Sequence, residues 1–163
     1  SRDVWILHSC YIKTDEGAIL FTANSGVGKS TQGKLWERYG GASIINEDRA
    51  LVFHNGDGFY AGGFVYSGSS KICENETMKV RAIVLVRQGS ENRVIRTRAG
   101  LAIKFLYMQL VSSNYRDQDK LKKMDFAERL FRENEVLTLT CRPDADAVMV
   151  LKDYLMSGGY DGT

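Results

Sequence analysis

Residues 25–31 read Ser-Gly-Val-Gly-Lys-Ser-Thr, and this segment constrains the fold more than any other. An apolar run, Ala18–Phe21, precedes it, and a stretch with helical character, Gln32–Tyr39, follows it. A strand, a glycine-rich turn, Lys-Ser and a helix in this order are typical of a phosphate-binding loop. The segment therefore predicts that the chain binds a nucleoside triphosphate, either ATP or another NTP.

The loop residues have distinct expected roles. Backbone N–H groups of residues 26–30 would surround the β-phosphate, and the positive end of the following helix would add to the attraction. Lys29 would contact the β- and γ-phosphates, and we expect it to face solvent in the empty site. The Ser30 hydroxyl would join the oxygen shell of Mg²⁺. The predicted nucleotide-binding residues are Ser25, Gly26, Val27, Gly28, Lys29, Ser30 and Thr31.

One position departs from the full phosphate-loop pattern. The pattern begins with Gly four residues before the Gly-Lys pair, and Ala23 stands there in this chain. Alanine can replace glycine if the backbone keeps a negative φ.

Two acidic residues, Glu47 and Asp48, follow the short apolar segment Ser43–Ile45. A carboxylate at a strand end beside a phosphate loop either holds Mg²⁺ or takes a proton from an attacking hydroxyl. Adjacent strand residues point to opposite faces, so both acids can serve one site only if the backbone turns between them. We expect Glu47 and Asp48 to be catalytic residues and Asp48, with Ser30, to be a metal ligand.

The order of predicted elements favours one α/β domain over residues 1–163. Val4–Lys13 is expected to form a strand, and the turn at 54–58 predicts a hairpin. Residues 62–79 lack periodicity, and we expect an irregular functional loop that walls the acceptor side of the site. The back half shows helical spacing around residues 101–111 and 121–131, and a last helix is expected to end at Leu155.

Composition excludes several classes of protein. The net charge of +2 and the scattered Lys and Arg residues do not indicate a nucleic-acid partner. The longest apolar run, Ala82–Val86, is too short to cross a membrane. Three widely spaced cysteines are typical of a reducing compartment, so a cytoplasmic location is expected.

His8, the 25–31 loop and Asn46-Glu47-Asp48-Arg49 occur in the order and spacing of the HPr kinase/phosphorylase catalytic domain, which is itself similar to the nucleotide-binding part of ATP-dependent phosphoenolpyruvate carboxykinase. The resemblance covers roughly residues 4–60. It implies a mixed sheet with hairpins in the front half and helices in the back half. It also implies that His8 is an active-site histidine, that Glu47 is the general base or its neighbour, and that Asp48 is a metal ligand. The family has Asp where this chain has Glu47.

The resemblance implies a Mg-ATP-dependent kinase that transfers the γ-phosphate to a hydroxyl of a protein serine, a peptide or a small molecule. Two alternatives stay open: a nucleotide-binding regulatory module without transfer chemistry, and an NTP hydrolase. The sequence does not name the acceptor, and it leaves open whether the chain forms a homo-oligomer.

Overall fold

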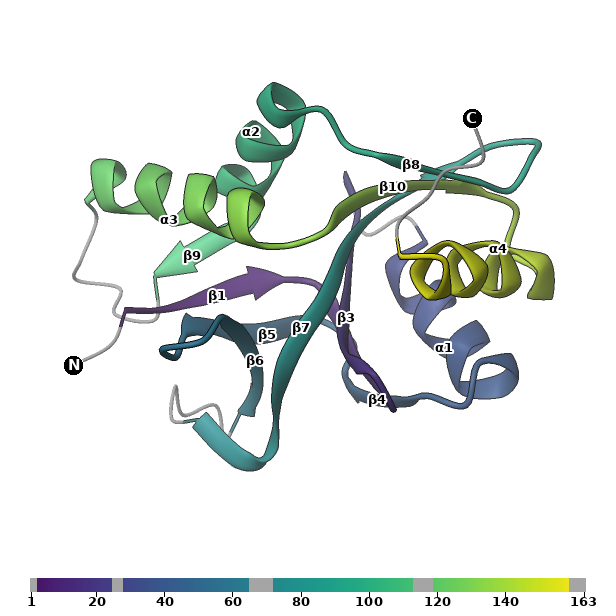
Figure 1. Ribbon diagram of the computed structural model, residues 1–163, viewed down its shortest axis with the longest axis horizontal. Helices are drawn as coiled ribbons and strands as arrows, with labels where there is room; N and C mark the ends of the chain where they lie inside the picture. Colours follow the sequence, from purple (N-terminus) through teal and green to yellow (C-terminus); the bar gives the residue numbers. More distant parts are fainter. Residues whose placement is uncertain (1–2, 25–27, 65–71, 113–118, 159–163) are drawn as a thin grey trace.

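The computed structural model describes residues 3–24, 28–64, 72–112 and 119–158 (Figure 1). Residues 25–27 of the predicted phosphate loop and residues 65–71 of the expected irregular loop lie outside these ranges. The elements, in chain order, are β1 (Val4–His8), β2 (Cys10–Thr14), β3 (Gly17–Thr22), α1 (Lys29–Tyr39), β4 (Ser43–Asn46), β5 (Arg49–His54), β6 (Phe59–Phe64), β7 (Ile72–Gln88), β8 (Arg93–Arg96), α2 (Ala99–Gln109), β9 (Leu110–Ser112), α3 (Lys120–Glu133), β10 (Val136–Cys141) and α4 (Ala145–Met156).

The long strand β7 joins two groups of strands. Its first part pairs antiparallel with β6, which continues through β5 and β1 to β9. Its second part pairs in parallel with both β3 and β10. Strands β2 and β4 extend the sheet beyond β3, and β8 forms the edge beyond β10. The described residues therefore form a mixed sheet in which antiparallel pairs predominate. A mixed sheet is what the sequence predicted.

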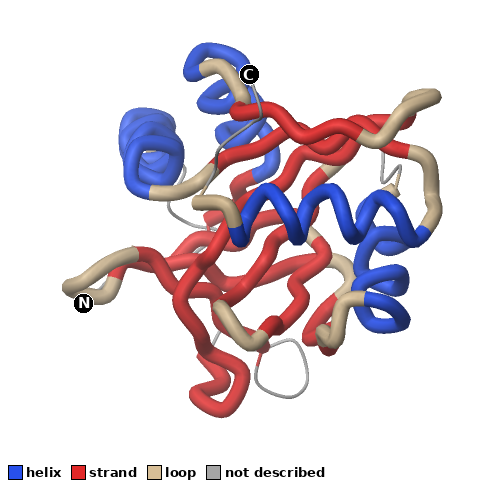
Figure 2. The backbone as a smooth tube through the Cα atoms, turned by 45° about the vertical axis from the view of Figure 1, so that its right-hand side comes forward, coloured by secondary structure: helices blue, strands red, loops and turns tan. Residues whose placement is uncertain are grey.

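The helices cover the strands from separate sides. Helices α1 and α4 pack on a core that includes Ile19, Phe21 and Trp36. Helices α2 and α3 pack on a second core that includes Leu20 and Phe126. Side chains alternate between these cores along β3, as the period of two in a strand dictates. Figure 2, turned by 45°, shows the same two helix pairs on different sides of the strands.

Two of the points at which the chain crosses between the two groups of strands are neighbours in space. The first crossing is at Ser9, between β1 and β2, and the second is at residues 47–48, between β4 and β5. The Ser9 N–H donates to the Asp48 carbonyl at 3.0 Å, and the Ser9 hydroxyl donates to the Leu7 carbonyl at 3.1 Å. The two crossings are thus bonded together, and they bring His8 close to Asp48.

Two sequence predictions need correction. The predicted single strand over Val4–Lys13 is two strands, because the chain turns at Ser9 from one group of strands to the other. The predicted irregular loop over 62–79 is wrong for 62–64 and 72–79, which lie in β6 and β7. The pairing of β6 with this part of β7 shifts register between Ala61 and Gly63, and such an irregularity interrupts the period of two.

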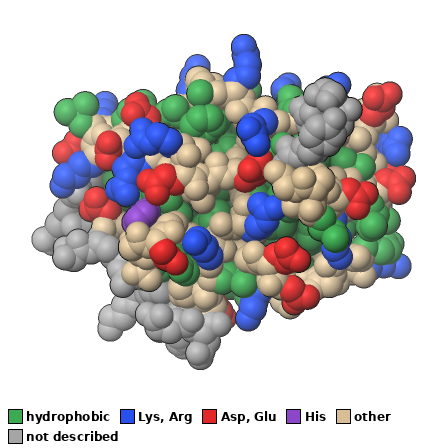
Figure 3. All heavy atoms as spheres, in the orientation of Figure 1, with side chains coloured by type: hydrophobic (Ala, Val, Ile, Leu, Met, Phe, Trp, Pro, Cys, Tyr) green, Lys and Arg blue, Asp and Glu red, His purple; other side chains and the backbone are tan. Residues whose placement is uncertain are grey.

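Other predictions of local structure are confirmed. The β5–β6 hairpin turns at residues 55–58, and the last helix, α4, ends at Met156, one residue beyond the expected Leu155. Three of the four described helices lie in the back half of the chain. No helix within the described ranges is long and apolar enough to cross a membrane. Figure 3 shows acidic and basic side chains intermingled on the face in view, in keeping with the low net charge.

We predict that Gly33→Ala destabilises the fold by about 1–3 kcal/mol, the usual cost of overpacking. A Cβ atom on Gly33 would lie 2.5 Å from the Sγ atom of Cys10, which is fully buried under α1. Urea denaturation measures the change in the free energy of unfolding.

Gly100→Ala is the matched control, because a Cβ atom there meets nothing within 4 Å and alanine favours the helix α2. Combining Gly33→Ala with Cys10→Ala should recover part of the loss by removing the sulfur atom. If Gly33→Ala alone has wild-type stability, the packing of α1 does not depend on the close approach of residue 33 to the Sγ atom of Cys10.

Candidate functional site

The candidate site lies where the start of α1 meets the two neighbouring crossings of the chain, at Ser9 and at residues 47–48. Gly28 precedes the helix with φ of 85°, a left-handed conformation that suits glycine. A Cβ atom on Gly28 would also lie 2.9 Å from Cγ1 of Val86. Glycine is therefore required here both by backbone conformation and by space, and the helix starts with Lys29 directed at the crossings.

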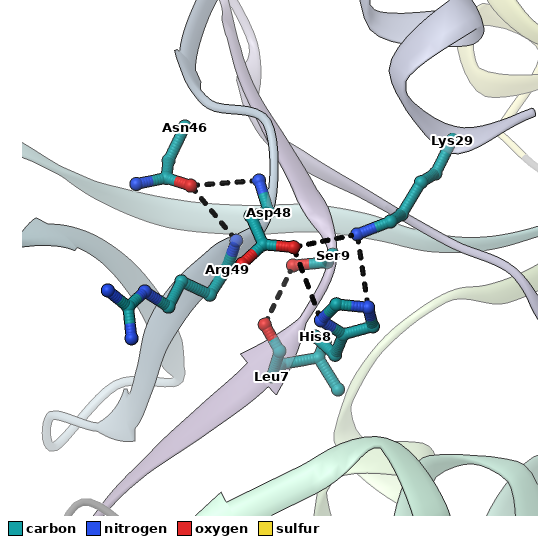
Figure 4. Close-up of polar contacts among 7 residues, drawn as sticks. All are labelled: Leu7, His8, Ser9, Lys29, Asn46, Asp48 and Arg49. Carbon is teal, nitrogen blue, oxygen red and sulfur yellow. Dashed lines mark hydrogen bonds and ion pairs between the residues drawn. The ribbon is translucent and has the colours of Figure 1, made fainter. Parts of the chain in front are cut away.

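Lys29 is the central residue of this site (Figure 4). Its Nζ atom lies 3.4 Å from Oδ1 of Asp48 and 3.2 Å from Nε2 of His8. The expectation that Lys29 faces solvent is wrong, since its side chain is only 6% exposed. A buried ammonium requires partners that compensate for its lost hydration, and Asp48 and His8 are those partners.

The contacts of His8 define its tautomer. An ammonium group can only donate hydrogen bonds, so Nε2 of His8 accepts from Lys29 and, in the neutral ring, the proton is on Nδ1. Nδ1 lies 3.6 Å from Oδ1 of Asp48. His8 thus contacts both charged partners and orients them relative to each other.

Asn46 holds the turn that presents Asp48. The side-chain oxygen of Asn46 accepts hydrogen bonds from the backbone N–H groups of Asp48 and Arg49, at 2.8 and 3.0 Å. This is the local turn that Asn forms with the backbone two residues ahead. The sequence prediction included Asn46 only as part of the motif Asn46-Glu47-Asp48-Arg49. An Asn two residues before Asp48 is nevertheless typical of a residue that holds such a turn.

The two acids are directed to different partners. Asp48 contacts Lys29, whereas the Glu47 carboxylate lies 3.9 Å from Nζ of Lys34, on the exposed side of α1. The backbone does turn at residues 47–48, but it separates the two carboxylates. The role of Glu47 as the general base stays a prediction.

Hard oxygen donors for Mg²⁺ are present at the site. The side chain of Asp48 is 68% exposed, and its described contacts use one carboxylate oxygen, Oδ1. Ser30 follows Lys29 in the first turn of α1. No cluster of three or more His, Cys, Asp or Glu side chains occurs among the residues that the structure describes. These donors suit a cation that keeps several waters and shares phosphate oxygens, as Mg²⁺ does.

Neighbouring side chains have structural roles. Burial raises the pKa of the Cys10 thiol to about 12, so this thiol stays protonated at neutral pH and cannot act as a nucleophile. On α1, Trp36 is buried in the core, whereas Tyr39 is exposed. Arg81 donates a hydrogen bond to the Leu155 carbonyl at the end of α4.

The end of β6 lies beside the acidic turn at Glu47-Asp48. The guanidinium of Arg49, which follows that turn, lies 4.8 Å from the ring centre of Phe64, the last residue of β6.

Comparisons with known proteins show a similarity in fold to solved structures. No protein-family model matches the sequence, and no curated protein matches it with statistical significance. The chain is similar in fold to the solved structure of the Hpr(Ser) kinase/phosphatase from Coxiella burnetii, with a TM-score of 0.49 and 9% sequence identity. The match covers 95% of this chain and 99% of that chain. A similarity at this level assigns neither a family nor an activity.

We predict that Asn46→Ala lowers the free energy of unfolding by about 1 kcal/mol, because two backbone N–H groups lose their acceptor. Asn46→Asp keeps an acceptor oxygen and should retain most of the stability, in a buffer with enough salt to screen its charge from Glu47 and Asp48. Urea denaturation of both variants is the measurement. An equal loss in both would mean that the side-chain oxygen of Asn46 does not hold the turn.

Proposed function

We propose that this chain binds a nucleoside triphosphate with Mg²⁺ and transfers the γ-phosphate to a hydroxyl acceptor. The observation that carries the proposal is the buried contact of Lys29 with Asp48 and His8 at the start of α1, directly after a glycine in the left-handed conformation. A lysine, a helix N-terminus and a carboxylate are the groups that phosphoryl transfer requires around the phosphates.

Lys29 would exchange partners when the phosphates bind. Its ammonium is a compact charge that phosphate oxygens attract strongly. Contact with the phosphates would weaken the pairing of Lys29 with Asp48, and the Asp48 carboxylate would then be available for a cation or an acceptor. His8 contacts both groups and would keep Asp48 oriented during the exchange.

The transfer step needs a proton acceptor near the attacking hydroxyl. The new bond joins the acceptor oxygen to the γ-phosphorus, and the bond between that phosphorus and the β,γ-bridging oxygen breaks. The hydroxyl proton passes to a carboxylate, for which Asp48 and Glu47 are the candidates. Mg²⁺, when bound by Ser30 and Asp48, would neutralise charge on the phosphates.

We predict that Lys29→Met lowers affinity for Mg-ATP by about 10–100-fold, the effect of losing a charge-assisted hydrogen bond. Methionine keeps the buried stem, and circular dichroism should show an intact fold. Lys34→Met is the matched control: Lys34 lies on the same helix, is 69% exposed and contacts Glu47. Titration calorimetry should give wild-type affinity for this control. Equal affinities for both variants would exclude Lys29 as a phosphate ligand.

A second pair of variants separates the roles of the acids. Asp48→Asn should weaken the dependence of ATP binding on Mg²⁺, because one anionic ligand is lost. Glu47→Gln should bind Mg-ATP normally. If Glu47 is the base, its turnover should fall by roughly 10²–10⁴-fold, and unchanged turnover would move this role to Asp48. Phosphate release in the absence of an added acceptor provides the turnover assay, with water as the acceptor.

The same assays distinguish the alternatives. ATP binding without any turnover, with or without candidate acceptors, would indicate a regulatory nucleotide-binding module. Phosphate release that no hydroxyl acceptor accelerates or diverts would indicate an NTP hydrolase.

A further inference from the structure

A cavity of about 240 Å³ lies at the end of α1 that is remote from Lys29. The helix rises about 1.5 Å per residue, so Tyr39 at this end lies roughly 15 Å from Lys29. An apolar cavity of about 150 Å³ can hold benzene, so this cavity has room for a small organic molecule. No role assigned above uses it.

Three parts of the chain surround the cavity. Residues 39–41 lie at the end of α1, residues 155–156 lie at the end of α4, and residues 14–16 lie at the turn between β2 and β3. Ile19 and Trp36, both buried, add an apolar wall. The cavity therefore combines polar groups with an apolar surface, as small-molecule sites do.

Charged side chains of both signs line the cavity without pairing with one another. Arg81 and Lys152 are positive, and Asp15 and Glu16 are negative. Across the ranges that the structure describes, no ion pair joins any of these four side chains to another. Opposite charges that line one small space and remain apart suit a ligand that carries both charges, because such a ligand can pair with each of them.

The two cations lie at the end of α4. Nη2 of Arg81 donates to the Leu155 carbonyl at 2.7 Å, which leaves other N–H groups of the guanidinium for a ligand. Lys152 precedes Leu155 by three residues, so the two residues share one side of the helix. A carboxylate suits this pair of cations, because both can donate charge-assisted hydrogen bonds to it.

The cavity also has negative groups. Asp15 and Glu16 are exposed on the turn between β2 and β3. The carbonyl end of α1 adds partial negative charge, as the last turn of any helix does. These groups suit the ammonium group of a ligand.

Trp36 supplies a buried donor without an acceptor. The residue is 3% exposed and lines the cavity. Its Nε1 atom is buried and has no hydrogen-bond partner in the described part of the chain. A buried polar group without a partner costs free energy, and a carboxylate oxygen that reached this N–H would remove that cost.

We propose that this cavity binds a free amino acid with an apolar side chain. The carboxylate lies between Arg81 and Lys152 and accepts a hydrogen bond from Nε1 of Trp36. The ammonium group lies toward Asp15 and Glu16, and the apolar side chain packs on the Trp36 ring. The site is separate from the phosphate loop, so this inference does not depend on the proposed function.

Titration calorimetry with leucine, methionine and phenylalanine tests the site. At least one of them should bind, and its binding should change the fluorescence of Trp36 in a Trp5→Phe variant, since Trp5 belongs to the other core. Analogues that lack the amino group or the carboxylate, which for leucine are isocaproate and isoamylamine, should bind at least about tenfold more weakly than the amino acid.

Two variants separate the two charges of the ligand. Lys152→Met should lower affinity for the amino acid by about tenfold and leave affinity for the amine analogue within about twofold of wild type, because it removes a partner of the carboxylate alone. Asp15→Asn combined with Glu16→Gln should lower affinity for the amino acid and leave affinity for the carboxylate analogue unchanged. Lys104→Met, at an exposed position on α2, is the matched control and should bind every ligand as the wild type does.

Failure of all three amino acids to bind would overturn the inference, and so would analogues that bind as tightly as the amino acid. An unchanged affinity for the amino acid in Lys152→Met would also overturn it. Displacement of the amino acid by Mg-tripolyphosphate would place the amino acid on the phosphate loop and contradict a separate site. Amino-acid binding in a protein that does not bind Mg-ATP would reject the proposed function and support this inference.

Discussion

The buried ammonium of Lys29 is the interaction on which the architecture of the site depends. Its contacts with Asp48 and His8 join the start of α1 to the two neighbouring crossings, at Ser9 and at residues 47–48. Lys29 is buried while Asp48 and His8 are partly exposed, so water screens these contacts only from the side of the two partners. The helix, the β1–β2 crossing and the β4–β5 turn are therefore held in one relative arrangement.

This arrangement suits a site that changes partners when a ligand arrives. Lys29 is buried but pairs with a carboxylate that is mostly exposed, so an incoming anion can approach the pair from the solvent side of Asp48. The phosphates would replace the carboxylate as the main partner of Lys29 without exposing the lysine. The fixed parts of the site are backbone elements: Gly28 at the start of α1 and the Asn46 turn. Chemistry that depends on positioning and charge requires such a rigid frame.

Local sequence signals predicted much of the fold. The apolar run before the loop, the glycines and the spacing of Lys29 predicted the β3–loop–α1 unit, because these features act over a few residues. The pairing of β7 with β6, β3 and β10 was not predictable in this way, since it depends on partners far away in the sequence. The break at Ser9 was missed for the same reason: β-forming residues lie on both sides of it, and only the contact with Asp48 reveals the crossing.

The candidate site shows the same division. Lys29 and Asp48 were predicted from motif and spacing, and His8 from the resemblance to the HPr kinase/phosphorylase domain. The structure brings the three side chains together. The burial of Lys29 and the separation of Glu47 from Asp48 depend on three-dimensional packing, so the sequence pattern could not provide them.

A crystal structure of the protein with Mg²⁺ and a non-hydrolysable ATP analogue is the most direct test of the central claim. We expect the phosphates on the 25–31 loop, with Nζ of Lys29 displaced from Asp48 and in contact with phosphate oxygens. A nucleotide bound elsewhere, or a nucleotide on the loop with Lys29 still paired to Asp48 and His8 and out of reach of the phosphates, would contradict it.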